Sequence, residues 1–408
     1  MKGKITGILS KCKYELGIFI ILMIHSMMNF VFEEGMSKFF VPYYLVDFSM
    51  GINSRLWVGS LVNLFTDHPT ENWINWFARI ILLLGLIITA VLLGKVVRMS
   101  KKEMRLILYG FILFFCSGSL TVACFSKYIG VLDIHMYILA LVAIVFARNK
   151  YLRWLVPLLC VAGVFVNYVF TISYFPMVIL AILYFADRDE KKAGNIMLFS
   201  ITVIIVLALT FYCVFLGKNY MKVTFDELWA IIEQKCGREF EFDVVRYFSL
   251  YLFGTDPINA VDKDVANASP LEFLQILSET LYSTTHDYRE ITTLLIISVP
   301  VIVMFWFIWI TCIRNTEKKS SKFVYFCFMI SVLCIPVCCL LSTDFIRWIS
   351  AGVMGQFALC FYMFALHDAP FEKAAEKIGA FFKRNKIALV FIFAFYGFIN
   401  EFQLVTLR

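Results

Sequence analysis

Long apolar runs recur along most of the chain, and they limit its possible folds more than any other feature. A helix needs about 20 apolar residues to cross a bilayer, and runs of this kind predict about eleven membrane-spanning helices. Their expected ranges are 15–33, 75–97, 105–125, 129–147, 154–173, 174–187, 194–216, 291–313, 323–342, 345–366 and 387–405. Pro176 separates the fifth range from the sixth, which is short.

The composition agrees with lipid as the main solvent. The chain is 61% hydrophobic and 16% charged, whereas soluble domains carry roughly 45–50% apolar and about 25% charged residues. In lipid the backbone must satisfy its own hydrogen bonds, so the spans are expected to be α-helices. We therefore predict an all-α polytopic membrane protein in which residues 1–408 form a single integral membrane domain. The first run, Leu16 to Phe32, lacks a small-residue cleavage site and is expected to be a retained span.

Basic residues predict the orientation. If the N-terminus lies inside, every inside connection carries several lysines or arginines, and together these hold most of the 37 in the chain. The positive-inside rule then places the N-terminus in the cytoplasm. The net charge of +7 is thus a signal of topology, and no nucleic-acid partner is expected. The expected location is the cell (plasma or inner) membrane, crossed many times.

Three outer regions follow from this orientation, at 33–75, 217–290 and 342–348. The second, between spans seven and eight, is by far the longest. On the inside, an amphipathic helix with basic flanks is expected at 371–385. Such a helix is typical of segments that rest on an anionic inner leaflet.

The large outer loop carries two helix-start patterns. Thr224 and Glu227 have the spacing of a capping box. Ser269, Pro270 and Glu272 repeat the design, with proline at the first helical position. Apolar stripes after both starts predict amphipathic helices that lie on the membrane surface or roof a cavity. A packed cap and a moving lid are both compatible with this pattern.

Motifs for nucleotide or zinc chemistry do not occur. The sequence contains no GxxxxGK[ST], GxGxxG or HExxH pattern. The 12 cysteines are scattered, and the 5 histidines have no metal-ligand spacing. No metal site is therefore predicted, and a divalent metal remains compatible with the chemistry considered below.

Charged residues gather near the outer ends of the spans. A charge at membrane depth costs roughly 2.5–3.5 kcal/mol on insertion scales, so each one needs a reason. The outer group consists of Glu33, Glu34, Asp47, Arg55, Arg79, Asp133, Asp344 and Arg347. Asp133, with His135 just inside the fourth span, is among the weaker candidates. The restriction of these charges to one side predicts a site at the outer face.

The stretch DFSMGINSRLW, Asp47 to Trp57, is the richest of these segments. If it were helical, Asp47, Gly51 and Arg55 would share one face, with the two charges about 12 Å apart. That spacing suits a carboxylate and a guanidinium that bind two parts of one ligand, because an arginine fork matches a phosphate. The alternative is a re-entrant or surface helix in which Asp47 is a cap and Arg55 lies at a lipid headgroup.

A second segment, STDFIRWIS, places Asp344 and Arg347 three residues apart at the outer start of the tenth span. In one interpretation Asp344 caps that helix and pairs with Arg347. In the other, Arg347 holds a lipid phosphate. Glu33 and Glu34 are either an interfacial stop or acidic groups of the same site.

This arrangement resembles the GT-C class of membrane glycosyltransferases, which take a sugar from a polyprenyl-phosphate carrier at the outer membrane face. The likeness lies in the acidic first outer loop, the long helical outer loop between spans seven and eight, and the inside N-terminus. DFSMGINSR and TDFIRW also look like segments of uncharacterised multi-span bacterial proteins associated with surface polysaccharides.

The resemblance implies roles for the outer charges. Asp47, or the Glu33-Glu34 pair, would be the acid/base carboxylate. Arg55 and Arg347 would bind the carrier phosphate. Two further members of the outer group, Asp344 and Arg79, are grouped with these carrier-binding candidates. The implied partners are a lipid-linked sugar donor, a glycan or lipid acceptor, and membrane lipid.

Three classes of function follow from these observations. The first is a lipid-linked sugar transferase or its relative, a polymerase of polysaccharide repeat units. The second is a flippase or transporter of lipid-linked sugars, which should carry polar residues through the middle of several spans. The third is a non-enzymatic scaffold of an envelope complex. The span centres are nearly free of charge, which favours the first class over the second.

Overall fold

The computed structural model describes residues 12–30, 36–118, 120–188, 192–242, 244–245, 248, 252, 288–335, 345–388 and 390–392. The chain is 81% helical with no strand among these residues, so the all-α prediction is confirmed. The predicted helix after Ser269 and most of the predicted span 387–405 lie outside the described residues.

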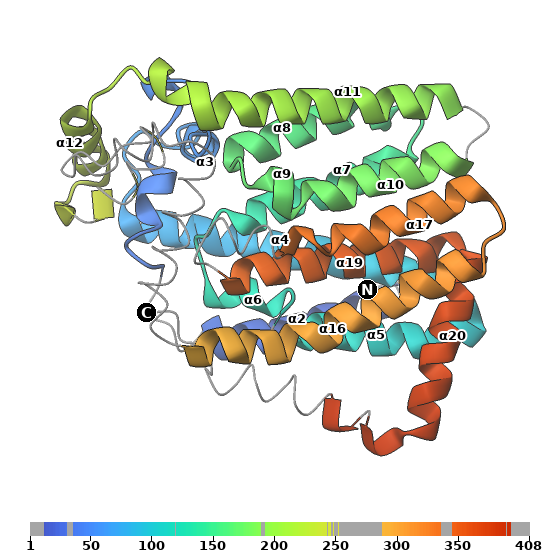
Figure 1. Cartoon of the computed structure of the whole chain (residues 1–408). Helices are drawn as coiled ribbons and strands as arrows, with labels where there is room; N and C mark the ends of the chain where they lie inside the picture. The colour runs from blue at the N-terminus through green and yellow to red at the C-terminus, as the bar shows by residue number, and fades with distance from the viewer. Residues whose placement is uncertain are drawn as a thin grey trace, which may run out of the picture.

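Most helices run side by side in one bundle (Figure 1). Its members are α2 (Lys13–Phe30), α4 (Glu71–Met99), α5 (Arg105–Ser117), α7 (Asp133–Arg148), α8 (Val156–Val166), α10 (Phe175–Arg188), α11 (Lys192–Phe211), α16 (Tyr288–Arg314), α17 (Lys319–Ser331) and α19 (Phe345–Leu366). The pairs α7–α8, α10–α11 and α16–α17 pack against each other. Each pair is joined by a short connection, which favours an antiparallel arrangement of neighbours.

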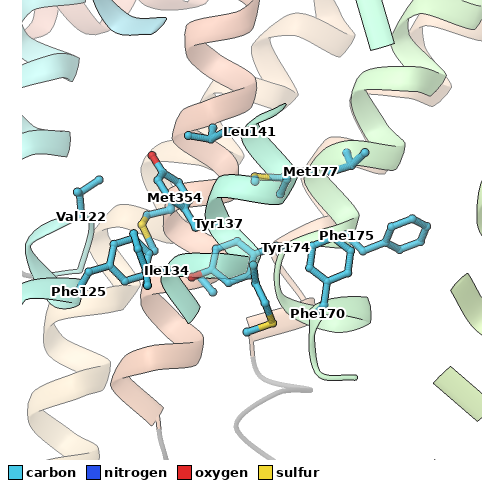
Figure 2. Close-up of a cluster of buried hydrophobic side chains, with 14 of the residues drawn as sticks. Val122, Phe125, Ile134, Tyr137, Leu141, Phe170, Tyr174, Phe175, Met177 and Met354 are labelled. Atoms are coloured by element: carbon cyan, nitrogen blue, oxygen red, sulfur yellow. The ribbon is translucent and has the colours of Figure 1, made fainter. Parts of the chain in front are cut away.

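The interior of the bundle is apolar and aromatic. Figure 2 shows Tyr137 of α7, Tyr174 just before α10 and Met354 of α19 converging on one another. All three are at most 1% exposed. Residues from segments far apart in sequence thus share one core.

Within the part of the chain that the structure describes, four helices are long and apolar enough to cross a membrane, at Glu71–Met99, Ala193–Tyr220, Ile296–Arg314 and Ile346–Leu366. Their outward faces are apolar as well. On α11, Ile204, Leu207 and Phe211 are each more than half exposed. A soluble protein rarely exposes so large an apolar patch, so these helices indicate a membrane protein.

Two predicted spans are interrupted in the structure. The range 105–125 contains α5 and, after a turn, the short α6 (Ala123–Lys127). The range 154–173 is divided into α8 and the short α9 (Phe170–Ser173). The break falls at Asn167, whose backbone is extended (φ −162°, ψ 126°). Hydropathy does not detect such a break, because the residues around Asn167 remain apolar.

The end of the bundle where α10 and α19 finish is held by a buried carboxylate. Asp368 accepts hydrogen bonds from the hydroxyls of Tyr184 and Tyr325, each at 2.7 Å, and from Arg188 at 2.5 Å. It also accepts the amide hydrogen of Phe371 and so caps α20 (Ala369–Arg384). We call this end, which also carries most of the basic connections, the basic end.

Helix α20 confirms the amphipathic helix predicted at 371–385, and it crosses the basic end at an angle to the bundle (Figure 1). Its apolar residues Phe371, Ala374, Ala375 and Ile378 are buried, and the helix packs on α16. The apolar stripe is therefore covered by protein, and lysines on the other face of the helix, such as Lys377, are exposed.

Candidate functional site

The opposite end of the bundle gathers the first loop, residues 36–70, and the segment 217–242 with α12 (Phe225–Cys236) (Figure 1). We call it the loop end. The first loop and this segment are joined by a bridge between Gly51 and Met221 and by a 2.8 Å hydrogen bond from the Lys222 amide to the Met50 carbonyl. Gly51 has φ +147°, and a Cβ there would lie 2.8 Å from the Tyr220 carbonyl oxygen. Only glycine suits this contact.

The segment from Asp47 to Trp57 is not a helix, so the predicted alignment of Asp47, Gly51 and Arg55 on one helical face is wrong. The structure has a 3-10 turn at Phe48–Met50, the bridge at Gly51, and then α3 (Trp57–Val62). Gly51 and the pairing with Met221 favour extended backbone over a continuing helix.

Asp47 is a buried anchor, only 4% exposed. Its carboxylate caps the 3-10 turn by accepting the Ser49 amide at 2.7 Å. It also accepts Asn63 Nδ2 at 2.6 Å and pairs with Lys235 Nζ of α12 at 2.5 Å. Burial raises the pKa of the Asp47 carboxyl, but the hydrogen bonds from Lys235 and Ser49 outweigh this effect and hold the pKa below its usual value. Asp47 is therefore ionised and bound at neutral pH.

Arg55 closes the break between α8 and α9. Its backbone lies in the left-handed region (φ 73°), and its amide donates to the Phe165 carbonyl at 2.7 Å. Next to it, Ser54 Oγ accepts the Tyr168 amide at 3.1 Å. Two backbone groups freed by the break are thus satisfied by the first loop, as a buried interruption requires.

The Arg55 side chain is held by aromatic rings. The residue is 6% exposed, and Nη1 donates to the Tyr43 hydroxyl at 3.0 Å. Its guanidinium carbon lies 5.6 Å from the Tyr43 ring centroid and 5.8 Å from that of Tyr168. A cation over such rings is attracted by their quadrupoles, which fixes a buried positive group at the loop end.

Arg347 pairs with Asp133. Its Nε and Nη2 atoms donate to the two carboxylate oxygens at 2.7 and 3.0 Å, a bidentate bond between the first turns of α19 and α7. Asp133 is 5% exposed. This partner belongs to neither interpretation of STDFIRWIS, which considered Asp344 or a lipid phosphate. Asp344 lies outside the described residues.

Arg79, a further predicted site residue, lies in the first half of α4, with its guanidinium carbon 5.5 Å from the Trp76 ring centroid. Glu33 and Glu34 lie outside the described residues. Within the described ranges, no group of three or more His, Cys, Asp or Glu side chains could hold a metal ion.

Among the described predicted charges, Asp47, Arg55 and the Asp133–Arg347 ion pair lie at this one end. The contacts of Asp47 in the described structure go to Ser49, Asn63 and Lys235. What links the charges is the short 3-10 helix Val41–Tyr44: Tyr43 binds Arg55, and the Tyr44 ring lies 6.2 Å from that of His135, two residues beyond Asp133.

Lys235 and Asn63 were not predicted as site residues. Lys235 occupies the last turn of α12, where a basic residue is ordinary, and nothing near it in sequence signals Asp47. Asp133 is one of the weaker candidates of the sequence, and its partner Arg347 lies more than 200 residues away along the chain.

Comparisons with known proteins add no relative: no family model, curated protein or solved structure matches this chain.

Proposed function

We propose that the chain is a membrane glycosyltransferase that transfers a sugar from a polyprenyl-phosphate carrier at the loop end, resembling the GT-C class. The proposed orientation places the N-terminus and the basic end in the cytoplasm and the loop end outside, with about eleven spans. The supporting observation is the burial of Asp47, Arg55 and Asp133 at this single end, with Arg347 beside them.

Burying charged side chains is costly even when they are paired, and such groups often mark functional sites. The charges at the loop end therefore support a site there. In the proposal Arg347 binds the carrier phosphate. The planar guanidinium fork matches phosphate oxygens as well as carboxylate oxygens, and Arg347 already binds one such anion, the Asp133 carboxylate. Arg55 adds a second fixed positive group near the developing phosphate charge.

The transfer also needs a base. The acceptor oxygen forms its bond to the anomeric carbon while the bond from that carbon to the phosphate oxygen breaks. The bonding electrons leave with the phosphate, and the acceptor proton passes to a carboxylate. We assign that carboxylate to Asp47, with Glu33 and Glu34 as the alternatives. Asp47 can accept the proton only after Lys235 withdraws, so the proposal requires α12 to move during turnover.

A polymerase of repeat units would use the same end and the same arginines, and it stays the nearest alternative. A flippase is less well supported. Polar groups deep in the described bundle bind each other: Gln356 accepts from Trp309 and donates to Ser331, and the Thr89 hydroxyl bonds Tyr137. These described groups are already paired with each other, which supports the transferase over the flippase.

The test measures sugar transfer in membranes that contain the protein. Radiolabelled polyprenyl-phosphate sugars are added as donors, and the acceptors are those already present in the membranes. Asp47→Asn and Arg347→Ala should each reduce product at least about 100-fold, as expected when a catalytic base or an oxyanion-binding group is lost. His68→Gln, at an exposed position of the first loop, is the control. Normal product from both site variants at equal protein level would refute the proposal.

A further inference from the structure

An exposed apolar stripe runs along the outward face of α4. Its members are each at least 39% exposed, and their spacing of three or four residues puts them on one side of the helix. They are Trp76, Ile80, Leu83, Leu84, Ile87 and Val91. Because α4 is long and apolar enough to cross a membrane, this stripe is the face that it turns to lipid.

The stripe continues onto the first loop through two further apolar residues. Leu64 and Phe65, just after α3, are 77% and 70% exposed. The Phe65 ring lies 6.2 Å from that of Phe77, which follows Trp76 near the start of α4. Single exposed apolar side chains are ordinary, whereas a patch that extends a lipid-facing stripe marks an interaction surface.

The contacts of α4 indicate the depth of this patch. Glu71, the first residue of the helix, pairs with Arg238 and so belongs to the polar part of the loop end. Phe77 lies about 9 Å further along the helix, at about 1.5 Å per residue. The Trp73 ring stacks on Phe77 at 5.3 Å, and tryptophan is typical of the membrane interface. Interfacial segments bury their apolar side to about this depth, roughly 5–10 Å.

We propose that Leu64 and Phe65 insert into the membrane leaflet at the loop end and anchor the first loop to it. The opposite side of α3 is held by protein, since Val62 is fully buried and α3 packs on the 3-10 helix Val41–Tyr44 and on α8. The partner of the exposed pair is the bilayer, at the boundary between headgroups and acyl chains.

The anchor adjoins the contacts of Asp47. Asn63, immediately before Leu64, donates its side-chain amide to the Asp47 carboxylate at 2.6 Å. Insertion of the next two residues therefore fixes the depth of Asp47 relative to the membrane surface. The anchor does not depend on the proposed transferase activity, because it follows from the exposure of the pair and from its contact with α4.

Photocrosslinking identifies what Phe65 contacts. The photoreactive residue p-benzoylphenylalanine replaces Phe65, Ile80 or His68 in the full-length protein, which is reconstituted into vesicles of phosphatidylethanolamine and phosphatidylglycerol. On irradiation the benzophenone carbonyl takes a hydrogen from a neighbouring C–H group and forms a bond to that carbon, so the labelled peptide gains the mass of its partner. Mass spectrometry should find lipid adducts at position 65 and at position 80, the lipid-facing control. Position 68, exposed in the same loop, should give none.

A charge beside the photoreactive residue tests insertion itself. Leu64→Glu should lower the lipid adduct at position 65 about fivefold, because a charge near the interface opposes insertion. Asp67→Asn, at an exposed polar position three residues further on, is the matched control and should leave the adduct unchanged. Thermal unfolding in detergent checks that both variants keep the fold.

The other outcomes each overturn the anchor. If position 65 captures another peptide of the chain, or captures nothing while position 80 captures lipid, the pair does not lie in the leaflet. A crosslink between two copies of the chain would assign the patch to an oligomer interface. If position 80 also captures no lipid, the stripe on α4 does not face the bilayer, and the anchor fails with it. The transferase proposal stands in the first two cases.

Discussion

Asp47 fixes the first loop through three contacts, and its ionised state is part of the fold. Because its pKa is held below the usual value, its charge stabilises the protein above the pKa of about 3.9 expected for an unfolded chain. That stabilisation is lost as the pH falls through the lower, folded pKa. The buried carboxylate thus stabilises the fold at neutral pH and makes it sensitive to acid.

We expect Asp47→Asn to lower the free energy of unfolding by about 1.5–3 kcal/mol at pH 7, the range for hydrogen bonds to charged groups. The deficit relative to the wild type should shrink as the pH is lowered below about 3.9. Denaturant unfolding in detergent between pH 3 and 7 measures the difference in the free energy of unfolding between the variant and the wild type. Asp67→Asn, at an exposed position of the same loop, should show neither effect. A deficit independent of pH would contradict the stabilising role of the charge.

At the scale of elements, α12 is tied to the first loop by its last turn. It begins with a complete capping box, in which Thr224 Oγ1 accepts the Glu227 amide and the Glu227 carboxylate accepts the Thr224 amide. Its other end carries Lys235, which reaches Asp47 and, at 3.0 Å, the Leu45 carbonyl. Stability at the start of α12 therefore supports an ion pair at its end.

Thr224→Ala should cost α12 about 0.5–2 kcal/mol, the usual range for a lost N-cap. Hydrogen exchange measured by mass spectrometry should show faster exchange over Phe225–Cys236 and over the first loop around Asp47. The interior of α4 should exchange as in the wild type, which provides the internal control. Faster exchange confined to α12 alone would argue against the coupling between the two segments.

Elements with local sequence patterns could be predicted, whereas elements set by long-range contacts could not. The capping box at Thr224 and the amphipathic helix α20 were predicted, because both patterns are local. The helix proposed for Asp47 to Trp57 was wrong, because its backbone is set by pairing with Met221 and by hydrogen bonds to Phe165 and Tyr168. Contacts over such separations leave no periodic signal in a single sequence.

On the scale of the whole molecule, the structure separates two ends of opposite character. The basic end is tied by Asp368 and its partners, and the loop end holds Asp47, Arg55 and the Asp133–Arg347 pair. The gathering of these charges at one end could be predicted from the sequence. Their partners could not, because Lys235 and Asp133 are recognisable only once α12 and α7 have been placed.

The proposed orientation has a direct test in a bacterial host. Alkaline phosphatase is active only where its disulfides form, outside the cytoplasm. A fusion after His68, in the first loop, should be active, and a fusion after Asn149, between α7 and α8, should be inactive. Western blots of both fusions control for their amounts. The reverse pattern would place the loop end in the cytoplasm and remove the extracytoplasmic donor from consideration.

The interruption between α8 and α9 gives the first loop a mechanical link to the membrane-embedded helices. Residues 54 and 55 bind both sides of that interruption. If the loop and the end of α8 shifted independently, the Phe165 carbonyl and the Tyr168 amide would lose their partners, the Arg55 amide and the Ser54 hydroxyl. A ligand that draws Arg55 toward itself would pull on the helix packed along α11 and α7. Binding at the loop end would thereby reach the helix bundle through these two hydrogen bonds.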